Sequence, residues 1–384
     1  MVNMNLDLGS SLHGVKKFFK NISRPSSAVG VDIGSQSIKV VELVRKKDKL
    51  VLSNYAYAKT DESLIKIGAP GVLSDMAGKV LSKTLEVSKI KTKEVNVAVP
   101  SFSSLVTIFE IPRMPEKEIN QAIRVEAPKY IPVRLSDVVY GWKIIDDTVG
   151  AKGKEGEQER KSNKKIVEPK MSDRMKVLVV AIMREISNKY EKVLGDSGIS
   201  VSSLEIDSFS LARSLLNRES ECALILDIGH KVTNLIVGVN KNILVNRTID
   251  VAGDSVTSVM GKSLGVDRKR AEQLKMDKGL QGAVNNGEAI LLPILGAITK
   301  EVSRTMEVLR EDYNGLEIQK IILSGGSSKL IGLREFIEQE SGVTTVIADP
   351  LVNFEYPSKL SADLKEQGPN LATAIGLAML GLED

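Results

Sequence analysis

The sequence of 384 residues predicts a duplicated, two-domain α/β protein. The main evidence is an internal repeat, because residues 29–43 return in altered form at 224–237. In both copies an apolar strand ends at an Asp, the chain turns at a Gly, and a second strand begins. A third strand is expected at 50–57 and at 243–249, so a three-strand meander occurs twice. The length agrees with two domains, because single cores rarely grow beyond roughly 250–300 residues.

Composition and charge exclude several classes of protein. With 42% apolar and 27% charged residues, the chain has the make-up of a folded α/β protein. The single cysteine, Cys222, cannot form an internal disulfide, and two histidines offer no metal-ligand spacing. No uncharged apolar run approaches the roughly 18 residues of a membrane span, and no signal-peptide core opens the chain, so we expect a cytoplasmic protein. Positive charge collects in residues 1–27 and 150–176, which leaves a slightly acidic remainder, and we expect no nucleic-acid partner.

The first half divides into three predicted segments. Residues 1–27 are a basic segment with apolar positions at helical spacing. We expect either a helix that docks on a membrane surface or a partner, or else a helix that caps the domain or a frayed terminus. Residues 28–99 hold the first meander, and residues 100–200 form an inserted α+β unit with a mobile charged loop at 150–174. The strands expected after the meander are 95–99, 105–111, 138–145, 175–182 and 199–206, and the helices are 74–88, one opening at Pro115, and 185–196.

The second half repeats the first domain and adds helices. Residues 201–264 carry the second meander and a helix at 252–265, residues 265–318 form a helical nucleotide-capping subdomain, and residues 319–384 complete the domain. A long helix is expected at 289–313 with a bend near Pro293. A buried strand at 319–324 leads through Gly325 and Gly326 directly into a helix that ends at Ser341, and the final helix is expected at 369–380.

The repeated Asp-x-Gly turns indicate a phosphate-binding site. Glycines at 34 and 229 let the backbone turn tightly, so that successive N–H groups can point at phosphate oxygens. Asp32 and Asp227 would then hold a hydrated Mg²⁺ against a nucleoside polyphosphate. Lys39 is expected beside the phosphates because period-two alternation places it on one strand face with Ser37. Taken singly, each Asp-x-Gly is also an ordinary hairpin turn, and it is the duplication that favours the binding site.

Three further features are open to two readings each. Glu272 and Lys275 share one helix face and are either ligands or a solvated ion pair. The Gly325-Gly326 turn either lets a flat ring approach closely or simply joins a strand to a helix. Asp207, at the start of the helix joining the halves, either orients water or Mg²⁺ or caps its helix.

These motifs together resemble the nucleotide signature of the actin, Hsp70 and sugar-kinase superfamily. They are Asp32-x-Gly34-Ser35-x-x-x-Lys39, Asp227-x-Gly229-x-x-Val232-Thr233, the Gly325-Gly326 turn and Ala374-Ile-Gly376-Leu-Ala378. The inserted unit resembles that of the cell-division protein FtsA and, more closely, that of the PilM family of type IV pilus proteins. The resemblance to the PilM family extends over nearly the whole chain, including the segments at 111–115, 126–132, 271–275 and 325–330. It implies an actin-like (ribonuclease H-like) duplicated ATPase fold with an FtsA/PilM-type inserted subdomain.

The same resemblance implies ATP and Mg²⁺ as cofactors and assigns roles to residues. The residues implied at phosphate are Gly34, Ser35, Gln36, Ser37, Lys39, Gly229 and Thr233, with Asp32 and Asp227 at the metal. Those implied at ribose and base are Glu272, Lys275, Gly325, Gly326, Ser328 and Lys329. Actin-like hydrolases carry an acidic residue where this chain has His230, so we expect slow turnover or a binding switch, with Asp207 as the tentative catalytic residue.

The resemblance also implies a partner and a place in the cell. PilM-like proteins hold the N-terminal tail of the inner-membrane protein PilN in a groove between the inserted unit and the neighbouring subdomain. We therefore expect a scaffold of the pilus assembly platform, associated with the inner membrane through PilN and other platform proteins. Self-association stays open. The alternatives are a small-metabolite kinase of the same superfamily and an FtsA-like filament tether, for which we would expect a C-terminal amphipathic helix.

Overall fold

A computed structural model of the protein describes residues 25–47, 49–60, 63–66, 72–145, 174–216, 221–239, 242–282, 284–285, 288–289, 291–313 and 315–383. The predicted basic segment 1–27 and the predicted loop 150–174 lie outside these residues, except for 25–27 and Arg174.

The first domain is built on a five-stranded sheet in the order β10-β6-β1-β2-β3. Its strands are β1 (Ser27–Ile33), β2 (Ser37–Lys46), β3 (Lys49–Lys59), β6 (Glu94–Val99) and β10 (Ser200–Ile206). β1, β2 and β3 form the antiparallel meander, while β6 and β10 continue the sheet in parallel on the other side of β1. The central strand β1 is buried over most of its length because helices cover both faces of the sheet.

The second domain repeats this sheet strand for strand. Its order is β13-β12-β11-β16-β17, which matches the first sheet read from β3 to β10. Its strands are β11 (Ala223–Ile228), β12 (Thr233–Val239), β13 (Asn242–Ile249), β16 (Lys320–Ser324) and β17 (Thr345–Ile347). The strand directions also match those of the first sheet. β11, β12 and β13 form an antiparallel meander, and β16 and β17 run parallel to β11 on its other side. The predicted duplicated α/β fold is therefore confirmed. Two short hairpins add β4 (Ile65–Lys66) with β5 (Val72–Leu73) and β14 (Val284–Asn285) with β15 (Glu288–Ala289).

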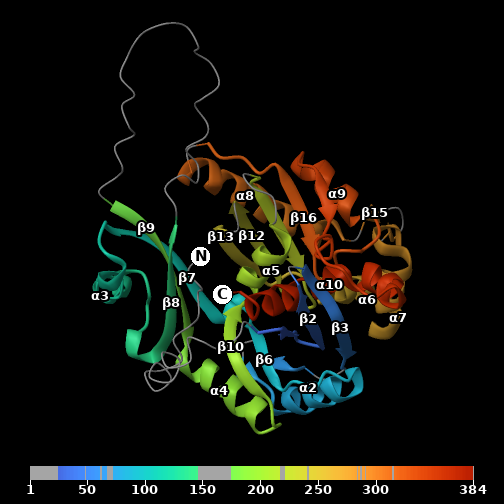
Figure 1. Cartoon of the computed structure of the whole chain (residues 1–384). Helices are drawn as coiled ribbons and strands as arrows, with labels where there is room; N and C mark the ends of the chain where they lie inside the picture. The colour runs from blue at the N-terminus through green and yellow to red at the C-terminus, as the bar shows by residue number, and fades with distance from the viewer. Residues whose placement is uncertain are drawn as a thin grey trace, which may run out of the picture.

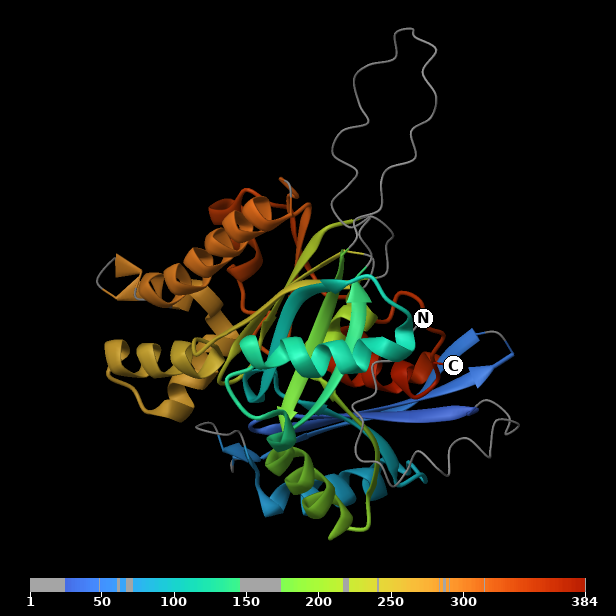
Figure 2. The same cartoon turned by 90° about the vertical axis from the view of Figure 1, so that its left-hand side faces the viewer.

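The inserted unit is a three-stranded sheet in the order β7-β9-β8, covered on one face by a helix. Its elements are the 3₁₀ turn η1 (Ser101–Ser103), β7 (Ser104–Pro112), α3 (Glu116–Glu126), β8 (Val138–Ile145) and β9 (Arg174–Met183). Ile119 and Ile123 of α3 are buried against Phe109 and Val177 of the sheet. Figure 2, in which this side of the molecule faces the viewer, shows α3 in front of the sheet.

Helices lie between the two large sheets and on their outer faces. α5 (Asp207–Leu215) and α10 (Ser361–Leu380) run through the middle of the molecule (Figure 1). The outer helices are α2 (Asp75–Ser88) and α4 (Arg184–Gly195) on the first sheet, and α6 (Gly253–Leu264), α7 (Arg268–Lys278), α8 (Leu292–Asp312) and α9 (Leu333–Ser341) around the second. Gly376 of α10 lies against the Ser210 carbonyl of α5, which leaves no room for a side chain at this crossing. Over the described residues, no helix is both long enough and apolar enough to span a membrane.

Three predicted helix boundaries were wrong. α8 begins at Leu292, so Pro293 lies in its first turn, where a missing N–H is harmless, and it does not bend the helix. α10 begins at Ser361 and contains Pro369 in its interior. The Pro369 carbonyl accepts hydrogen bonds from the Gly325 backbone N–H and the Ser324 hydroxyl, which hold this part of α10 against β16. α9 begins at Leu333, after further turns beyond the glycines.

Candidate functional site

The two hairpins end in the same turn. Gly34 donates its backbone N–H to the Ser37 carbonyl at 2.8 Å, and Gly229 donates to the Val232 carbonyl at 3.0 Å. In the strand registers Asp32 lies opposite Lys39, and Asp227 lies opposite Asn234. The residue equivalent to Lys39 in the second hairpin is therefore Asn234.

A cavity of about 110 Å³ lies between these turns, with walls from both domains. The sequence-predicted residues that line it are Asp32, Gly34, Ser35, Gln36, Ser37, Lys39, Asp207, Asp227 and Gly229. His230, Lys231 and Asn234 also line it, although none of them was assigned from the sequence. The structure thus brings both acidic hairpins to one cavity.

In the first hairpin the acid and the lysine are paired. Lys39 Nζ donates to Asp32 Oδ2 at 2.9 Å, and the two side chains are only 16% and 17% exposed. Burial on its own would lower the pKa of Lys39, but the charge and hydrogen bond of Asp32 outweigh it and leave this pKa above its ordinary value. Lys39 therefore stays positively charged at the cavity wall.

In the second hairpin the acid has no such partner. Burial, with the charge of Asp32 added, raises the pKa of Asp227 to about 6, although the charge of Lys39 acts against the rise. Burial also raises the pKa of Asp207 to about 7; hydrogen bonds from Ser101 oppose the shift, and the charges of Asp227 and Asp32 add to it. With three carboxyl groups against Lys39 and Lys231 on its walls, the cavity carries a small excess of negative charge once the carboxyl groups are ionised.

Asp207 is a bridge between elements and does not cap its helix. α5 begins at Asp207 itself, with Ile206 in the cap position. One carboxylate oxygen accepts the backbone N–H of Ser101 at 3.1 Å and also its hydroxyl, while the other accepts Asn234 Nδ2 at 3.2 Å. The interpretation of Asp207 as a helix cap is therefore wrong, because both of its carboxylate oxygens bind residues outside α5. Asp207 ties the start of the inserted unit to β12.

Thr233, which was implied at phosphate, does not reach the cavity. It is fully buried, and its hydroxyl donates to the Val251 carbonyl at 2.5 Å. The physical reason is strand alternation: Thr233 lies opposite Ile228, one residue out of step with the cavity-facing pair Asp227 and Asn234. The same alternation that identified Lys39 would have identified Asn234, at the same offset from its Asp.

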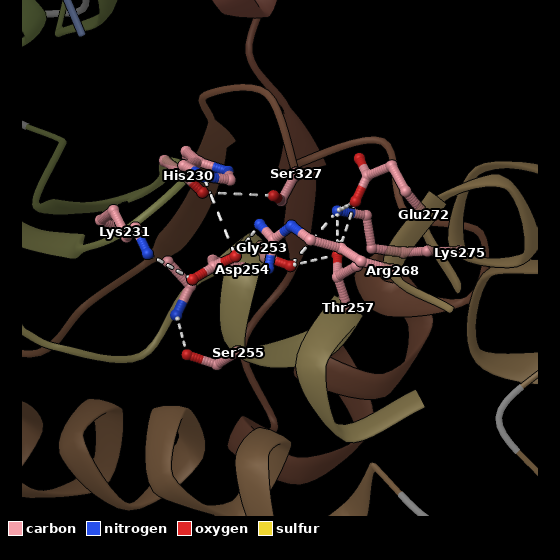
Figure 3. A network of polar contacts seen from close by, with 12 residues as sticks. His230, Lys231, Gly253, Asp254, Ser255, Thr257, Arg268, Glu272, Lys275 and Ser327 are labelled. Carbon is pink, nitrogen blue, oxygen red and sulfur yellow. Dashed lines mark hydrogen bonds and ion pairs between the residues drawn. The ribbon is translucent and has the colours of Figure 1, made fainter. Parts of the chain in front are cut away.

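Glu272 and Lys275 lie in a polar network directly behind the second hairpin turn (Figure 3). Lys275 Nζ donates to Glu272 Oε2 at 2.7 Å, to Thr257 Oγ1 at 2.9 Å and to the Gly253 carbonyl at 3.2 Å. Lys275 is only 11% exposed while Glu272 is 45% exposed, so the ion pair is partly buried rather than fully solvated. Gly253 in turn donates its N–H to the Gly229 carbonyl at 3.2 Å, which connects the network to the turn.

The Gly325-Gly326 turn packs against the same hairpin from the other side. Gly325 has φ +82°, and a Cβ there would lie 2.6 Å from the Ile228 carbonyl oxygen, so only glycine fits. Ser327 Oγ donates to the Gly229 carbonyl at 3.3 Å.

Ser328, implied at the adenine, is buried and donates its hydroxyl to the Gly325 carbonyl at 2.7 Å, so it closes the turn. Burial lowers the pKa of Lys329. None of Glu272, Lys275, Gly325, Gly326, Ser328 and Lys329 lines the cavity itself.

The cavity residues fit Mg²⁺ only together with a phosphate ligand. Among the described residues, no group of three or more Asp, Glu, His or Cys side chains could hold a metal ion alone. Mg²⁺ in nucleotide sites is usually held by one or two carboxylates, phosphate oxygens and water. Asp32 and Asp227 supply such carboxylates, and a divalent cation would offset the excess negative charge.

Two sheets of identical strand order, joined by α5 and α10 and meeting at paired acidic hairpins, define an actin-like protein of the α/β class. The family model described as "Type IV pilus assembly protein PilM" matches residues 30–157 and 164–382. The chain therefore belongs to the PilM family, and the resemblance found in its motifs is confirmed.

Comparisons with other proteins agree with this assignment. The solved "PilM-PilN type IV pilus biogenesis complex" is similar to the chain with a TM-score of 0.77 and 24% identity, and covers 94% of this chain and 100% of that one. The ethanolamine utilization protein EutJ from Carboxydothermus hydrogenoformans has a TM-score of 0.50 at 15% identity, covering 95% and 93%. At these identities both show the fold alone.

Curated relatives are cell division proteins. The chain is 27% identical to FtsA of Pseudomonas aeruginosa over 231 residues, which span 54% of each protein. It is 22% identical to FtsA of Streptococcus pneumoniae over 372 residues, spanning 86% of this chain and 77% of the relative. The chain thus covers about half the length of the first of these relatives.

Proposed function

We propose that this chain is an ATP-binding scaffold of the type IV pilus assembly platform that holds the cytoplasmic tail of a PilN-like inner-membrane protein. The observation that carries the nucleotide part is the single cavity lined by both Asp-x-Gly hairpins. In this proposal the chain works in the cytoplasm, at the inner membrane through its partners, with membership of the PilM family as support for the partner.

Each wall of the cavity has a distinct task in the proposed site. The Gly34 and Gly229 turns let the backbone approach the phosphates closely, and Lys39 would supply the positive charge for phosphate oxygens. When bound, Mg²⁺ would neutralise phosphate charge and bridge it to Asp32 and Asp227. Ribose and base would extend toward Glu272, Lys275 and the Gly325-Gly326 turn, which adjoin the Gly229 turn.

Binding requires the cleft to open. Small-molecule pockets usually measure roughly 300–1,000 Å³, whereas this cavity measures about 110 Å³. Its walls belong to two separate sheets, so a hinge rotation between the domains can enlarge it. Lys39 must also leave Asp32 Oδ2 to contact a phosphate, which exchanges one ionic partner for another.

The site favours holding ATP over turning it over rapidly. Asp207, the tentative catalytic residue, has both carboxylate oxygens engaged by Ser101 and Asn234, so it is placed as a structural bridge. His230 stands where actin-like hydrolases have an acid. We therefore infer at most slow hydrolysis and a binding switch.

A groove beside the inserted unit is the proposed place of the tail. It measures about 570 Å³ and runs between β7 and β9 of the inserted sheet and β13 and α8 of the second domain. Its apolar lining includes Val106, Ile108 and Val308. On the other side the inserted unit shares a packed core with the first domain, where Val180 and Ile182 are buried beside Ile186 of α4.

The strand β13 connects the cavity to this groove, with one side-chain hydrogen bond near each. Asp207 and Asn234 line the cavity, and Thr248 of β13 donates to Asn234 Oδ1 at 2.8 Å. Two residues along β13, Asn246 lines the groove and donates its amide to Ser208 Oγ at 3.2 Å. Opening the cleft would therefore move β13, which forms one wall of the groove.

Two measurements test the proposal. ATP with Mg²⁺ at saturation should raise the melting temperature by roughly 3–8 °C, because it binds only the folded chain. A peptide of about ten residues copying the N-terminus of the PilN protein of the same genome should bind with a dissociation constant in the micromolar range or tighter. Absence of the thermal shift would contradict the nucleotide site, and rapid ATP turnover stimulated by one metabolite would favour the kinase alternative.

A variant in the groove tests whether the peptide binds there. Val308→Asp should weaken the peptide by about tenfold or more, because it places a charge on the apolar lining. Val352→Asp is the matched control, since Val352 is 70% exposed and lies outside the groove. Equal binding by both variants would place the tail on the first-domain side of the inserted unit.

A further inference from the structure

Exposed lysines gather at one end of the first sheet. Ser27 at the start of β1 lies opposite Val44 near the end of β2, and β6 runs parallel to β1. The turn from β2 to β3 and the loop from α2 to β6 therefore lie at the same end, about two strand spacings or 10 Å apart. In Figure 2 the blue strands reach the edge of the molecule at this end. Its exposed lysines, which we call the basic end, are Lys46, Lys47, Lys49, Lys89, Lys91 and Lys93.

The fold itself leaves the basic end largely unpaired. Within the described residues only Lys49 of this group has an ion-pair partner, which is Glu355 at 2.5 Å. Lys46 lies directly opposite Lys49 in the strand register, and like charges in such a pair are destabilising. The lysines are therefore placed together at a cost to the hairpin, which an anionic partner would relieve.

Acidic residues at this end reduce the positive charge only in part. Asp196 is bound by Lys192 at 2.9 Å, and Glu383 is bound by Arg213 at 3.1 Å. That leaves the acids Asp48 and Glu94 of the two loops to set against the basic end. The excess of positive charge attracts an anionic surface or ligand.

The segment that precedes β1 leaves from the same end. The Ser26 carbonyl accepts the Arg45 backbone N–H at 2.8 Å, just before the turn from β2 to β3. Residues 1–24 lie outside the described residues, but their sequence is amphipathic. At about 100° per residue its apolar side chains fall within an arc of about 120°, and its cations fall on the opposite face. The apolar residues are Leu12, Val15, Phe18, Phe19 and Ile22, and the cations are Lys16, Lys17, Lys20 and Arg24.

The two features together indicate a membrane surface among the anionic partners. Clustered lysines are attracted to anionic lipid headgroups. An apolar helix face flanked by lysines can enter the boundary between headgroups and acyl chains. A nucleic acid would match the lysines, but it offers no apolar layer for a face of this kind.

We propose that the basic end and residues 12–24 form a lipid contact, through which the chain lies directly on an anionic membrane surface. This contact is distinct from the groove proposed for the partner tail, and it does not depend on the nucleotide site. Two weak attachments to one membrane would reinforce each other through their high effective concentration. Asp32 lies near the other end of β1, so the cavity would face away from the membrane.

Cosedimentation of the full chain with vesicles, without any partner protein, tests the proposal. At about 0.1 M salt the chain should bind vesicles of phosphatidylcholine with about 30% phosphatidylglycerol at least tenfold more tightly than vesicles of phosphatidylcholine alone. Lys46→Gln with Lys91→Gln, one from each loop, should weaken this binding by about tenfold or more. Phe18→Ser with Phe19→Ser should weaken it by a similar factor, because the apolar face loses two large side chains.

The matched control is Lys269→Gln with Lys278→Gln. It removes the same charge from exposed positions on α7 of the second domain and should change vesicle binding by less than about twofold. All three double variants change exposed positions or residues outside the described structure, so their melting temperatures should stay within about 2 °C of the parent.

Four results would overturn the lipid contact. They are no binding of the parent chain to anionic vesicles, an equal loss in the control pair, parent-like binding by the variant of the basic end, and parent-like binding by the phenylalanine variant. In the last case, tighter binding of a DNA or RNA duplex than of vesicles would identify a nucleic acid as the partner instead. Each of these results would leave the nucleotide site and the peptide groove standing.

Discussion

The two hairpins have the same turn and the same strand register, yet they differ in charge. In the first, Asp32 lies opposite Lys39 and is paired with it at 2.9 Å. In the second, Asp227 lies opposite Asn234, whose amide turns to Asp207. In the first copy the acid is therefore paired with a cation, while in the second copy Asp227 has no paired cation.

In the proposed site this difference divides the work between the domains. The paired hairpin would supply a charged amine for phosphate, and the unpaired hairpin would supply Asp227 for the cation. Asn234 also links the second hairpin through Thr248 to β13, whereas Lys39 makes no comparable link. Duplication thus produced two similar backbones with complementary side chains.

The largest expected effect comes from removing the charge of the first hairpin. Lys39→Met should raise the dissociation constant of ATP with Mg²⁺ by about 100-fold, because charge-assisted contacts to phosphate are among the strongest hydrogen bonds. Calorimetry checks this, with Lys46→Met as the control, since Lys46 is an exposed residue at the end of the same strand. A change below about threefold would show that Lys39 does not contact phosphate.

Neutralising the two equivalent acids should change stability in opposite directions. Asp32→Asn leaves Lys39 without its partner and should lower the free energy of unfolding by about 2 kcal/mol. Asp227→Asn removes a buried charge that has no paired cation, and should raise the same free energy by about 1–2 kcal/mol near pH 8. Urea unfolding of the ligand-free chains measures both. Changes of the same sign would break the comparison.

The unpaired acids should also give a distinctive pH dependence. The pKa values of about 6 for Asp227 and about 7 for Asp207 lie above the ordinary value of 3.8, so the folded state binds more protons than the unfolded one. Their stabilising contribution is complete below about pH 4 and is lost as the pH rises through 6 to 7, at an integrated cost of a few kcal/mol.

His230 acts in the opposite direction, because its lowered pKa makes the folded chain bind fewer protons. The comparison is therefore made between the parent and the Asp207→Asn, Asp227→Asn double variant. Between about pH 5 and about pH 8 the parent should lose about 4 kcal/mol more of its unfolding free energy than the variant. Parallel pH profiles would contradict the assigned pKa shifts.

The smallest expected difference concerns the two turn glycines. A Cβ at Gly229 would lie 3.0 Å from the Val232 carbonyl oxygen, which is backbone and cannot easily move. A Cβ at Gly34 would meet Lys39 Nζ at 3.2 Å, the end of a flexible side chain. Gly229→Ala should therefore cost about 1 kcal/mol of stability and Gly34→Ala less than about 0.5 kcal/mol. Equal losses of unfolding free energy for the two variants in chemical denaturation would show that the two turns tolerate an added Cβ equally well.

Local sequence patterns predicted most of the fold. Both meanders, the inserted unit and the outer helices follow from strand alternation, helical spacing and Gly or Pro punctuation, and the structure has them at nearly the expected bounds. One exception lies at a tertiary contact. The last helix was expected to begin at Pro369, but α10 begins at Ser361 and runs through Pro369, whose carbonyl accepts hydrogen bonds from Ser324 and Gly325 of the second domain.

The site was less predictable where it depends on long-range contacts. Asp32, Lys39 and Asp227 follow from the motif, and Asn234 would have followed from strand alternation. The role of Asp207 would not, because its partner Ser101 is 106 residues away in the chain.

The most direct test is a crystal structure of the chain with a non-hydrolysable ATP analogue and Mg²⁺. The phosphates should lie between the Gly34 and Gly229 turns, with Lys39 Nζ moved from Asp32 onto a phosphate oxygen and the metal beside Asp227. A nucleotide bound elsewhere, or one held by a single hairpin while Lys39 stays on Asp32, would contradict the shared site.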